Sequence, residues 1–192
     1  SGYGNGANGY QALNSNTTGY YNVANGYDAL RSNSSGYHNI ANGFKALRYN
    51  TTGYGNVANG YESLHNNNVG YYNTANGYQA LRGNTGGDGN VANGFQALYA
   101  NTGDNNVAVG YQAGNSITTG SNLTVIGYDA DASSATATNE ITLGNASVSS
   151  LRIPGLQAGA SNGQVLTYNS SNGNIAFATA GGAAALGDLS DG

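Results

Sequence analysis

Cysteine, methionine and tryptophan are absent from this sequence, and proline occurs only once. Without cysteine the chain forms no disulfide and offers no thiolate ligand to a metal. Charged residues make up 7% of the chain, and its 5 basic residues form no run. A nucleic-acid surface needs clustered positive charge, and a membrane-spanning helix needs ~20 consecutive apolar residues. We therefore expect no nucleic-acid partner and no membrane span.

Large apolar residues are also scarce, since Leu, Ile, Val and Phe together account for 31 of the 192 residues. Such a low share is typical of disordered chains. Disorder, however, normally accompanies high charge and irregular sequence. Here the formal net charge is −4, and the stretch TGYYNVANGYDAL at 18–30 returns as TGYGNVANGYESL at 52–64. A regular, repetitive structure fits this pattern better than disorder.

The sequence consists largely of a repeat that reads approximately GYxNVANGYxALxxNTT, with a period of about 17 residues. We use the word column for the residues that occupy one position in successive repeats. Two columns consist of glycine. One contains Gly9, Gly26, Gly43, Gly60, Gly77, Gly94, Gly110, Gly127 and Gly144. The other precedes it by seven residues and contains Gly2, Gly19, Gly36, Gly53, Gly70, Gly87, Gly103 and Gly120.

So short a repeat has too few residues for the helix pairs of common helical repeats, and the glycines and Asn/Thr clusters oppose helix. Each repeat instead predicts two short strands, one at NVANGY and one near xALx, joined by Asn, Thr, Ser and Gly turns. Such a unit forms one coil of a stacked solenoid. The predicted fold class is all-β: a parallel β-solenoid (β-roll) of about nine 17-residue coils over residues 1–144.

Stacked coils place equivalent residues above one another at about 4.8 Å, which favours the same residue in each coil. Three columns follow this rule. Asn25, Asn42, Asn59, Asn76 and Asn93 are expected to form an amide column, Tyr27, Tyr61 and Tyr78 an aromatic one, and Leu30, Leu47, Leu64 and Leu81 an aliphatic one. The position after the tyrosine varies among Gln11, Asp28, Lys45 and Glu62, so we expect it to face water.

The repeat changes near its end, because Val109, Ile126 and Leu143 replace the asparagine of the amide column. Residues 103–144 therefore read as transition or capping coils, which solenoids require at their termini. So thin a coil buries little apolar surface, and neither disulfide nor metal is expected to stabilise it. Association with identical chains is the remaining source of stability, so we expect a homo-oligomer.

The chain after the solenoid divides into three expected parts. Residues 145–160 form a strand and linker, with Val148, Leu151 and Ile153 as the strand. Residues 161–180 form a β-hairpin whose strands are VLTY and IAFA. Residues 181–192 are a Gly/Ala-rich joint. Because the chain opens within a repeat, we interpret it as a piece of a longer polypeptide.

The unit NVAxGYxALxxNTTG resembles the repeats of phage tail fibres and is similar to the head repeats of trimeric autotransporter adhesins. The tracts TLGNASVSSLRIPGL, NGQVLTYNSSNGNIAFA and ALGDLSDG resemble modules that follow such repeats in tail fibres of marine phages. The resemblance implies a homotrimeric virion fibre that joins other tail proteins and attaches to a host surface. One departure is the asparagine that six coils carry where adhesin repeats have an apolar residue, which implies an amide-lined seam.

No catalytic, cofactor or metal constellation is expected. His38 and His65 stand at different positions of the repeat, and both are expected to be exposed. Asp129, Asp131 and Glu140 are interpreted as solvated residues. Exposed aromatic rings among amides are suited to sugar rings, so Tyr21, His38 and Tyr72 are candidate contacts for a host-surface glycan. The alternative is that these aromatic positions pack between chains.

Two other functions remain open at this stage. A bacterial trimeric adhesin head, or an extracellular filament assembled end to end on the cell surface, would use the same repeat. An ice-binding solenoid would present a flat column of threonines, but Thr17 and Thr51 alternate with Ser34 and give way to Asn68. The tracts after residue 144 favour the phage fibre.

Overall fold

The computed structural model describes residues 2–150, 164–169 and 174–179, with the backbone alone for the last two ranges. Its contacts divide the chain into two units, Ser1–Ser147 and Val148–Gly192. Within the described residues every regular element is a β-strand, and no helix long and apolar enough to cross a membrane occurs among them. The all-β class is therefore confirmed.

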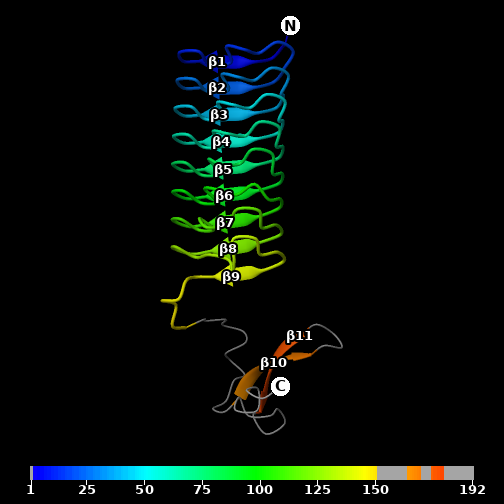
Figure 1. Cartoon of the computed structure of the whole chain (residues 1–192), viewed down its shortest axis with the longest axis vertical. Coiled ribbons are helices and arrows are strands. Elements are labelled where there is room, and N and C mark those ends of the chain that lie inside the picture. The colour runs from blue at the N-terminus through cyan, green and yellow to red at the C-terminus, as the bar shows by residue number, and fades with distance from the viewer. Residues whose placement is uncertain (1, 151–163, 170–173, 180–192) are drawn as a thin grey trace. The chain divides into compact units, whose positions relative to one another are not determined.

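The first unit contains one parallel sheet of nine strands, arranged in chain order (Figure 1). Each strand has three residues. They are β1 (Gly6–Asn8), β2 (Val23–Asn25), β3 (Ile40–Asn42), β4 (Val57–Asn59), β5 (Thr74–Asn76), β6 (Val91–Asn93), β7 (Val107–Val109), β8 (Thr124–Ile126) and β9 (Ile141–Leu143). Successive strands pair residue by residue with their repeat equivalents, as in Ala24 with Ala41. The expected β-solenoid is confirmed, with about eight turns between the first and last strands.

Each coil contains one strand, so the second strand expected near xALx is wrong. That segment is a turn, and two of its residues have left-handed backbone: φ is 56° at Asp28 and 49° at Leu30. The same angles recur in the equivalent residues of the other coils. A non-glycine residue resists this conformation by roughly 1–2 kcal/mol. The turn persists because the Leu30 N–H donates to the Ala46 carbonyl and the leucine side chain is fully buried.

The Gly26 column, which follows each strand, has to be glycine for two reasons. From Gly9 to Gly127 its φ angles lie between 133° and 145°, a region that other residues rarely enter. The coils also approach one another closely here, since a Cβ on Gly26 would collide with the Gly43 carbonyl group. The glycine spacing that defines the repeat is therefore the spacing of these close approaches.

Small side chains and one leucine per coil fill the apolar core. Ala24 points inward from its strand, and Ala29 and Leu30 point inward from the turn, and all three are fully buried. The outer face of each strand carries the other two side chains. One outer column contains Val23, Ile40, Val57, Thr74, Val91, Val107, Thr124 and Ile141. The other is the amide column, in which the Asn25 side-chain amide donates to Asn42 Oδ1 at 2.8 Å, as expected.

Two further asparagine columns lie inside the coil. The Asn22 column contains Asn22, Asn39, Asn56, Asn73, Asn90 and Asn106, and all are fully buried. The Asn33 column contains Asn33, Asn50, Asn67, Asn84 and Asn101, also fully buried. The two columns meet at the Gly36 carbonyl oxygen, which accepts the amide of Asn22 at 2.8 Å and that of Asn33 at 3.0 Å. The interior is therefore partly a hydrogen-bonded amide network.

This network ends between the seventh and the eighth strand. Ile117 takes the position of Asn101, Leu123 that of Asn106, and Val125 that of Ala108. All three side chains are buried. Both asparagine columns stop together because an amide left without its partner column would be buried and unsatisfied.

In the second unit, β10 (Gln164–Asn169) pairs antiparallel with β11 (Asn174–Thr179). These strands contain the VLTY and IAFA segments expected to form a hairpin, but its turn at 170–173 lies outside the described residues. Of the expected strand at 148–153, residues 148–150 form none, and 151–153 lie outside the described residues, as does the joint at 181–192.

Candidate functional site

An aromatic column runs along one edge of the first five coils. Its members are Tyr3, Tyr20, Tyr37, Tyr54 and Tyr71. Consecutive rings are stacked nearly parallel, with centroids 4.8 to 5.4 Å apart. The spacing follows that of the coils, so the backbone stack positions the rings. The hydrogen bond to the adjacent Asp88 carboxylate raises the pKa of Tyr71 above its ordinary value.

The three candidate glycan contacts flank this column. Tyr21, His38 and Tyr72 each have left-handed backbone, with φ of 54° to 56°. The Tyr21 ring lies edge-on to Tyr20, and His38 stacks on Tyr21 at 5.5 Å. Tyr72 lies edge-on to Tyr54. It is two coils from His38, and Gly55 takes the same position in the coil between them. The structure therefore brings Tyr21 and His38 together and leaves Tyr72 apart.

Glycine makes room for the flanking tyrosines. A Cβ on Gly55 would lie 2.7 Å from a ring carbon of Tyr72, and one on Gly4 would lie 2.5 Å from a ring carbon of Tyr21. Tyr21 is 53% exposed and Tyr72 is 62% exposed, and His38 is also exposed. All three side chains are accessible to a ligand, and contact with a glycan remains a prediction.

A second aromatic column lies beside the strands. Tyr10, Tyr27, Phe44, Tyr61, Tyr78, Phe95, Tyr111 and Tyr128 stack with centroid separations of 4.9 to 5.4 Å. Most of these rings are more than two-fifths exposed, and Val23, Ile40 and Val91 on the outside of the strands are also exposed. The outer columns of the strands, the amide column among them, and these aromatic rings together form the surface that we call the strand face.

The expectation that the position after each tyrosine faces water is wrong in two coils. Asp28 is buried and lies 3.1 Å from Arg48 Nε and 3.7 Å from Arg31 Nη1. The two basic residues come from its own turn and from the next coil. Residue variety at this position therefore reflects different partners and does not by itself indicate exposure.

Glu62 is the second exception. It is buried, and its carboxylate accepts from Arg82 Nε at 2.8 Å and from Gln79 Nε2 at 3.0 Å. Burial is the largest single effect and raises the pKa of Glu62. The hydrogen bonds from Arg82 and Gln79, with the positive charge of Arg82, outweigh burial and lower its pKa overall. Glu62 is therefore an internal partner of Arg82.

His65 was expected to be exposed, and this is wrong because it is buried. Its Nδ1 lies 2.9 Å from Asn66 Oδ1, and its ring meets the Tyr49 ring edge-on at 5.0 Å. Burial lowers the pKa of His65, and the charges of Arg82 and Arg48 lower it further. The imidazole is therefore neutral at neutral pH, and the Asn66 contact makes Nδ1 the protonated nitrogen.

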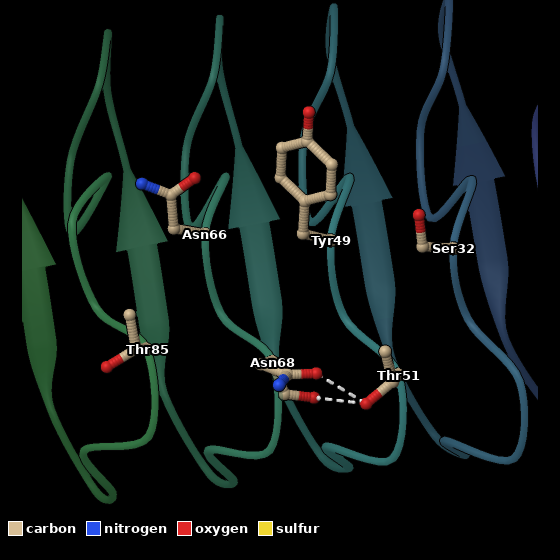
Figure 2. A pocket seen from close by; sticks show the side chains of 6 residues that line it. All are labelled: Ser32, Tyr49, Thr51, Asn66, Asn68 and Thr85. Carbon is tan, nitrogen blue, oxygen red and sulfur yellow. Dashed lines mark hydrogen bonds between the residues drawn. The ribbon is translucent and has the colours of Figure 1, made fainter.

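An open depression of about 500 Å³ lies on the surface beside His65. Figure 2 shows its six lining side chains in two rows along the stack of coils. Ser32, Tyr49 and Asn66 form one row, and Thr51, Asn68 and Thr85 form the other. The lining is made of hydroxyls, amides and one phenol ring, a composition that suits a polar ligand. Nothing in the sequence distinguishes these residues from ordinary turn residues.

The acidic residues near the end of the solenoid do not converge. Asp129 is exposed, Asp131 accepts the Ser116 N–H, and Glu140 accepts from the N–H and hydroxyl of Ser133. These bonds stabilise turns, and those to Ser133 lower the pKa of Glu140. No group of acidic, His or Cys residues placed to hold a metal occurs within the described ranges.

No protein-family model matches this sequence, and no curated protein or solved structure matches the chain.

Proposed function

We propose that this chain is a structural segment of a phage tail fibre, a homotrimeric rod that holds host-binding parts away from the virion. The observation that carries the proposal is the strand face. Val23 and Ile40 are each 39% exposed on it, and exposed apolar side chains recur along it at Val91 and Ile141, with Thr74 and Thr124 as the polar members of the same column. Isolated soluble chains rarely expose continuous apolar surfaces, and a surface of this kind usually marks a contact with a partner.

A second copy of the chain is the partner that this face fits best. The face repeats every coil, so an identical chain in register would match it along its whole length. Toward the end of the solenoid the amide column becomes apolar. Val109, Ile126 and Leu143 replace its asparagines there, and all three are exposed. The number three comes from the resemblance to trimeric fibres and adhesins.

The rod's contribution to the fibre is mechanical. Successive coils are bonded through their strands and turns, and up to the seventh strand also through asparagine columns. Such a rod resists bending and proteolysis, as a spacer on a virion surface requires. Attachment to a host glycan through Tyr21, His38 and Tyr72 is part of the proposal, as is the junction with other tail proteins.

The ice-binding alternative is less well supported. The column that contains Thr17, Thr51 and Thr102 would have to present hydroxyls to water. Each of these hydroxyls instead donates to a carbonyl of the next coil, at 2.8 to 3.2 Å. A column whose donors are used internally is poorly suited to order water.

Light scattering on the purified chain tests the proposal. One chain has a mass of 19.3 kDa. A trimer closed by symmetry should therefore have a mass of about 58 kDa, and this is the expected value. A monodisperse monomer would reject the trimeric fibre. A very large and polydisperse mass would indicate end-to-end filaments, the bacterial alternative.

A further inference from the structure

One basic residue stands at the same position in each of four successive coils. The residues are Arg31, Arg48, His65 and Arg82, and Asn14, Tyr99 and Asn115 take the position elsewhere. Main-chain bonds link this column to the row that lines the depression, since the Tyr49 N–H donates to the His65 carbonyl and the Asn66 N–H to the Arg82 carbonyl. The basic column therefore runs beside the depression, one residue away in sequence.

Positive charge in the solenoid is confined to the coils around the depression. Residues 1–147 contain four Lys or Arg, namely Arg31, Lys45, Arg48 and Arg82. The only acids among these coils are Asp28 and Glu62, which leaves a local charge of +2. Every other acid of the solenoid lies at residue 88 or beyond. In a chain with a negative net charge, a single positive region gives an anionic ligand a defined place to bind.

The polar network beside the depression is incomplete. In the part of the chain that the structure describes, the buried side-chain N and O atoms without a hydrogen-bond partner are Asp28 Oδ1, Arg48 Nε and His65 Nε2. Arg48 Nε does lie 3.1 Å from Asp28 Oδ2, but its N–H is not directed at that oxygen. Unsatisfied buried groups are rare. Two of these three belong to side chains that contact a lining residue, since the Arg48 guanidinium lies over the Tyr49 ring and the His65 ring meets it edge-on, and Asp28 is the ion-pair partner of Arg48. We call the basic column and the depression together the basic corner.

The depression offers contacts of two kinds. The Tyr49 ring is 44% exposed, and the Arg48 guanidinium lies over it, 5.0 Å from the ring centroid. Tyr49 lies between Ser32 and Asn66 in one row, and the hydroxyl and amide groups of Thr51 and Asn68 lie in the other row (Figure 2). A sugar ring can place an apolar face on a tyrosine and bond its hydroxyls to such groups.

We propose that the basic corner binds an acidic polysaccharide whose pyranose units carry carboxylates. One pyranose ring packs on Tyr49, and its hydroxyls bond to the two polar rows. Carboxylates of the polysaccharide pair with Arg48 and Arg82. Successive basic residues are one coil apart, about 4.8 Å, which is comparable to the length of one pyranose unit. The proposal rests on the surface-attachment part of the proposed function and names the ligand class.

Nucleic acid fits the basic corner less well. Binding of a single strand uses several aromatic rings on which successive bases stack, and Tyr49 is the one aromatic residue lining the depression. All three arginines are also partly neutralised by internal carboxylates, which reduces attraction to densely charged phosphates.

Calorimetric titration of the full chain with tetragalacturonate tests the proposal, with its fully methyl-esterified, uncharged form as the matched ligand. Three variants use residues that occur at the same position in other coils. Arg48→Asn, which copies Asn14, removes a carboxylate contact, and Tyr49→Ser, which copies Ser15, removes the ring. Each should weaken binding about tenfold, the expected effect of losing one charged hydrogen bond or ring contact. Glu62→Gln, which copies Gln79, frees Arg82 and should strengthen binding severalfold.

Lys45→Gln is the control, because it removes one positive charge outside the basic column. It should leave affinity nearly unchanged, and the methyl ester should bind at least about tenfold more weakly than the acid. Equal loss in Lys45→Gln and Arg48→Asn would overturn the site in favour of diffuse charge. Absence of binding, equal binding of the ester, or tighter binding of an oligonucleotide would also overturn it.

Two further measurements keep this proposal separate from the fibre. The unfolding midpoint of each variant shows whether the loss reflects misfolding, and Glu62→Gln cannot gain affinity by misfolding. Light scattering on the same samples reports association independently. If the chain is a trimer that does not bind tetragalacturonate, only the acidic-saccharide site is refuted. If the chain is a monomer that binds tetragalacturonate, only the trimeric fibre is refuted.

Discussion

The Oδ1 atom of Asn22 accepts two hydrogen bonds from Asn39, one from its main-chain N–H at 3.0 Å and one from its side-chain amide at 3.1 Å. The same pair of bonds links Asn39 to Asn56 and continues along the column. Each asparagine thus replaces a strand-like bond between coils. The solenoid is held together inside as well as at its strands, which allows three-residue strands to suffice.

Removing one buried amide should cost far more than removing an exposed one. Asn39→Ala deprives two buried donors of Asn56 of their acceptor, at roughly 1–3 kcal/mol for each group. We expect it to lower the free energy of unfolding by about 3 kcal/mol. Asn42→Ala, three residues away in the partly exposed column, should cost under about 1 kcal/mol. Urea unfolding of both variants measures the difference, and equal losses would contradict the buried network.

The apolar residues that end the asparagine network predict how the network can be shortened. Asn101→Ile copies Ile117, and Asn106→Leu copies Leu123. Each single change leaves part of the other asparagine without its partner, because Asn106 donates to Asn101 Oδ1. The double variant should therefore be more stable than the sum of the singles predicts, by about 1 kcal/mol. A double-mutant cycle in urea gives this coupling energy, and strict additivity would show that the two columns end independently.

The repeat length, the parallel stack and the outer columns follow from the sequence because equivalent residues must lie above one another. The sequence does not distinguish the buried Asn22 and Asn33 from the exposed Asn25, since all three recur with the same period. The difference between them appears only in the folded coil, which closes through a turn with left-handed backbone at Asp28 and Leu30. That turn is not predictable, because Leu30 has no preference for positive φ and adopts it only when buried by the neighbouring coils.

The basic corner is not predictable for a different reason. Asp28 pairs with residues three and twenty positions away, and Glu62 with one twenty positions away. A column read on its own shows only that acid, base and amide are all accepted there. The compensation appears when two columns are read together across adjacent coils, a pattern that needs the coil geometry first.

The free energy of unfolding should decrease as the pH is lowered below 6.5, because of His65. Its folded pKa lies below its ordinary value of 6.5, chiefly because of burial. Above pH 6.5 the imidazole is neutral in both states and adds no pH dependence. Below it the unfolded chain takes up a proton that the folded chain does not, so stability decreases as pH falls toward the folded pKa. Glu62 adds a second loss below 4.5, because its folded pKa is lowered and protonation there removes its ion pair with Arg82.

Thermal unfolding from about pH 8 down to about pH 3, which spans the ordinary pKa values of both groups, checks this prediction. His65→Asn, which copies Asn14 and Asn115, should flatten the decline over the upper window and leave the loss below 4.5 in place. His38→Asn is the control, since His38 is exposed and should change the profile little. A profile for His65→Asn that matches the unmodified chain would show that His65 does not set this window.

A charged residue introduced on the strand face should dissociate the proposed trimer. Ile40→Lys places an ammonium on the outer column of β3, where three chains would bury it. The mass should fall to the 19.3 kDa of one chain, while the coil itself stays folded because this side chain is 39% exposed in the single chain. Tyr21→Asn, which copies Asn105, is the control away from the strands and should keep the trimer. Light scattering and circular dichroism together separate dissociation from unfolding.

Removing whole coils tests whether the solenoid is modular. Deleting residues 53–86 takes out two repeats and rejoins the chain in register, because the cut ends occupy equivalent positions. Each coil contacts only its neighbours, so the shortened chain should fold and associate, with a rod about 10 Å shorter. Small-angle scattering gives the length, and native mass gives the association.

The matched control deletes eight residues, 53–60, which is less than half a repeat. It places the Gly26 and Gly36 columns out of register and sets side chains where adjacent coils approach too closely for a Cβ, so it should unfold the solenoid. If the in-register deletion also unfolds or loses its association, stability depends on the whole length of the rod and the modular description is wrong. If the chain instead tolerates the out-of-register deletion, the close approaches at glycine do not set the repeat length.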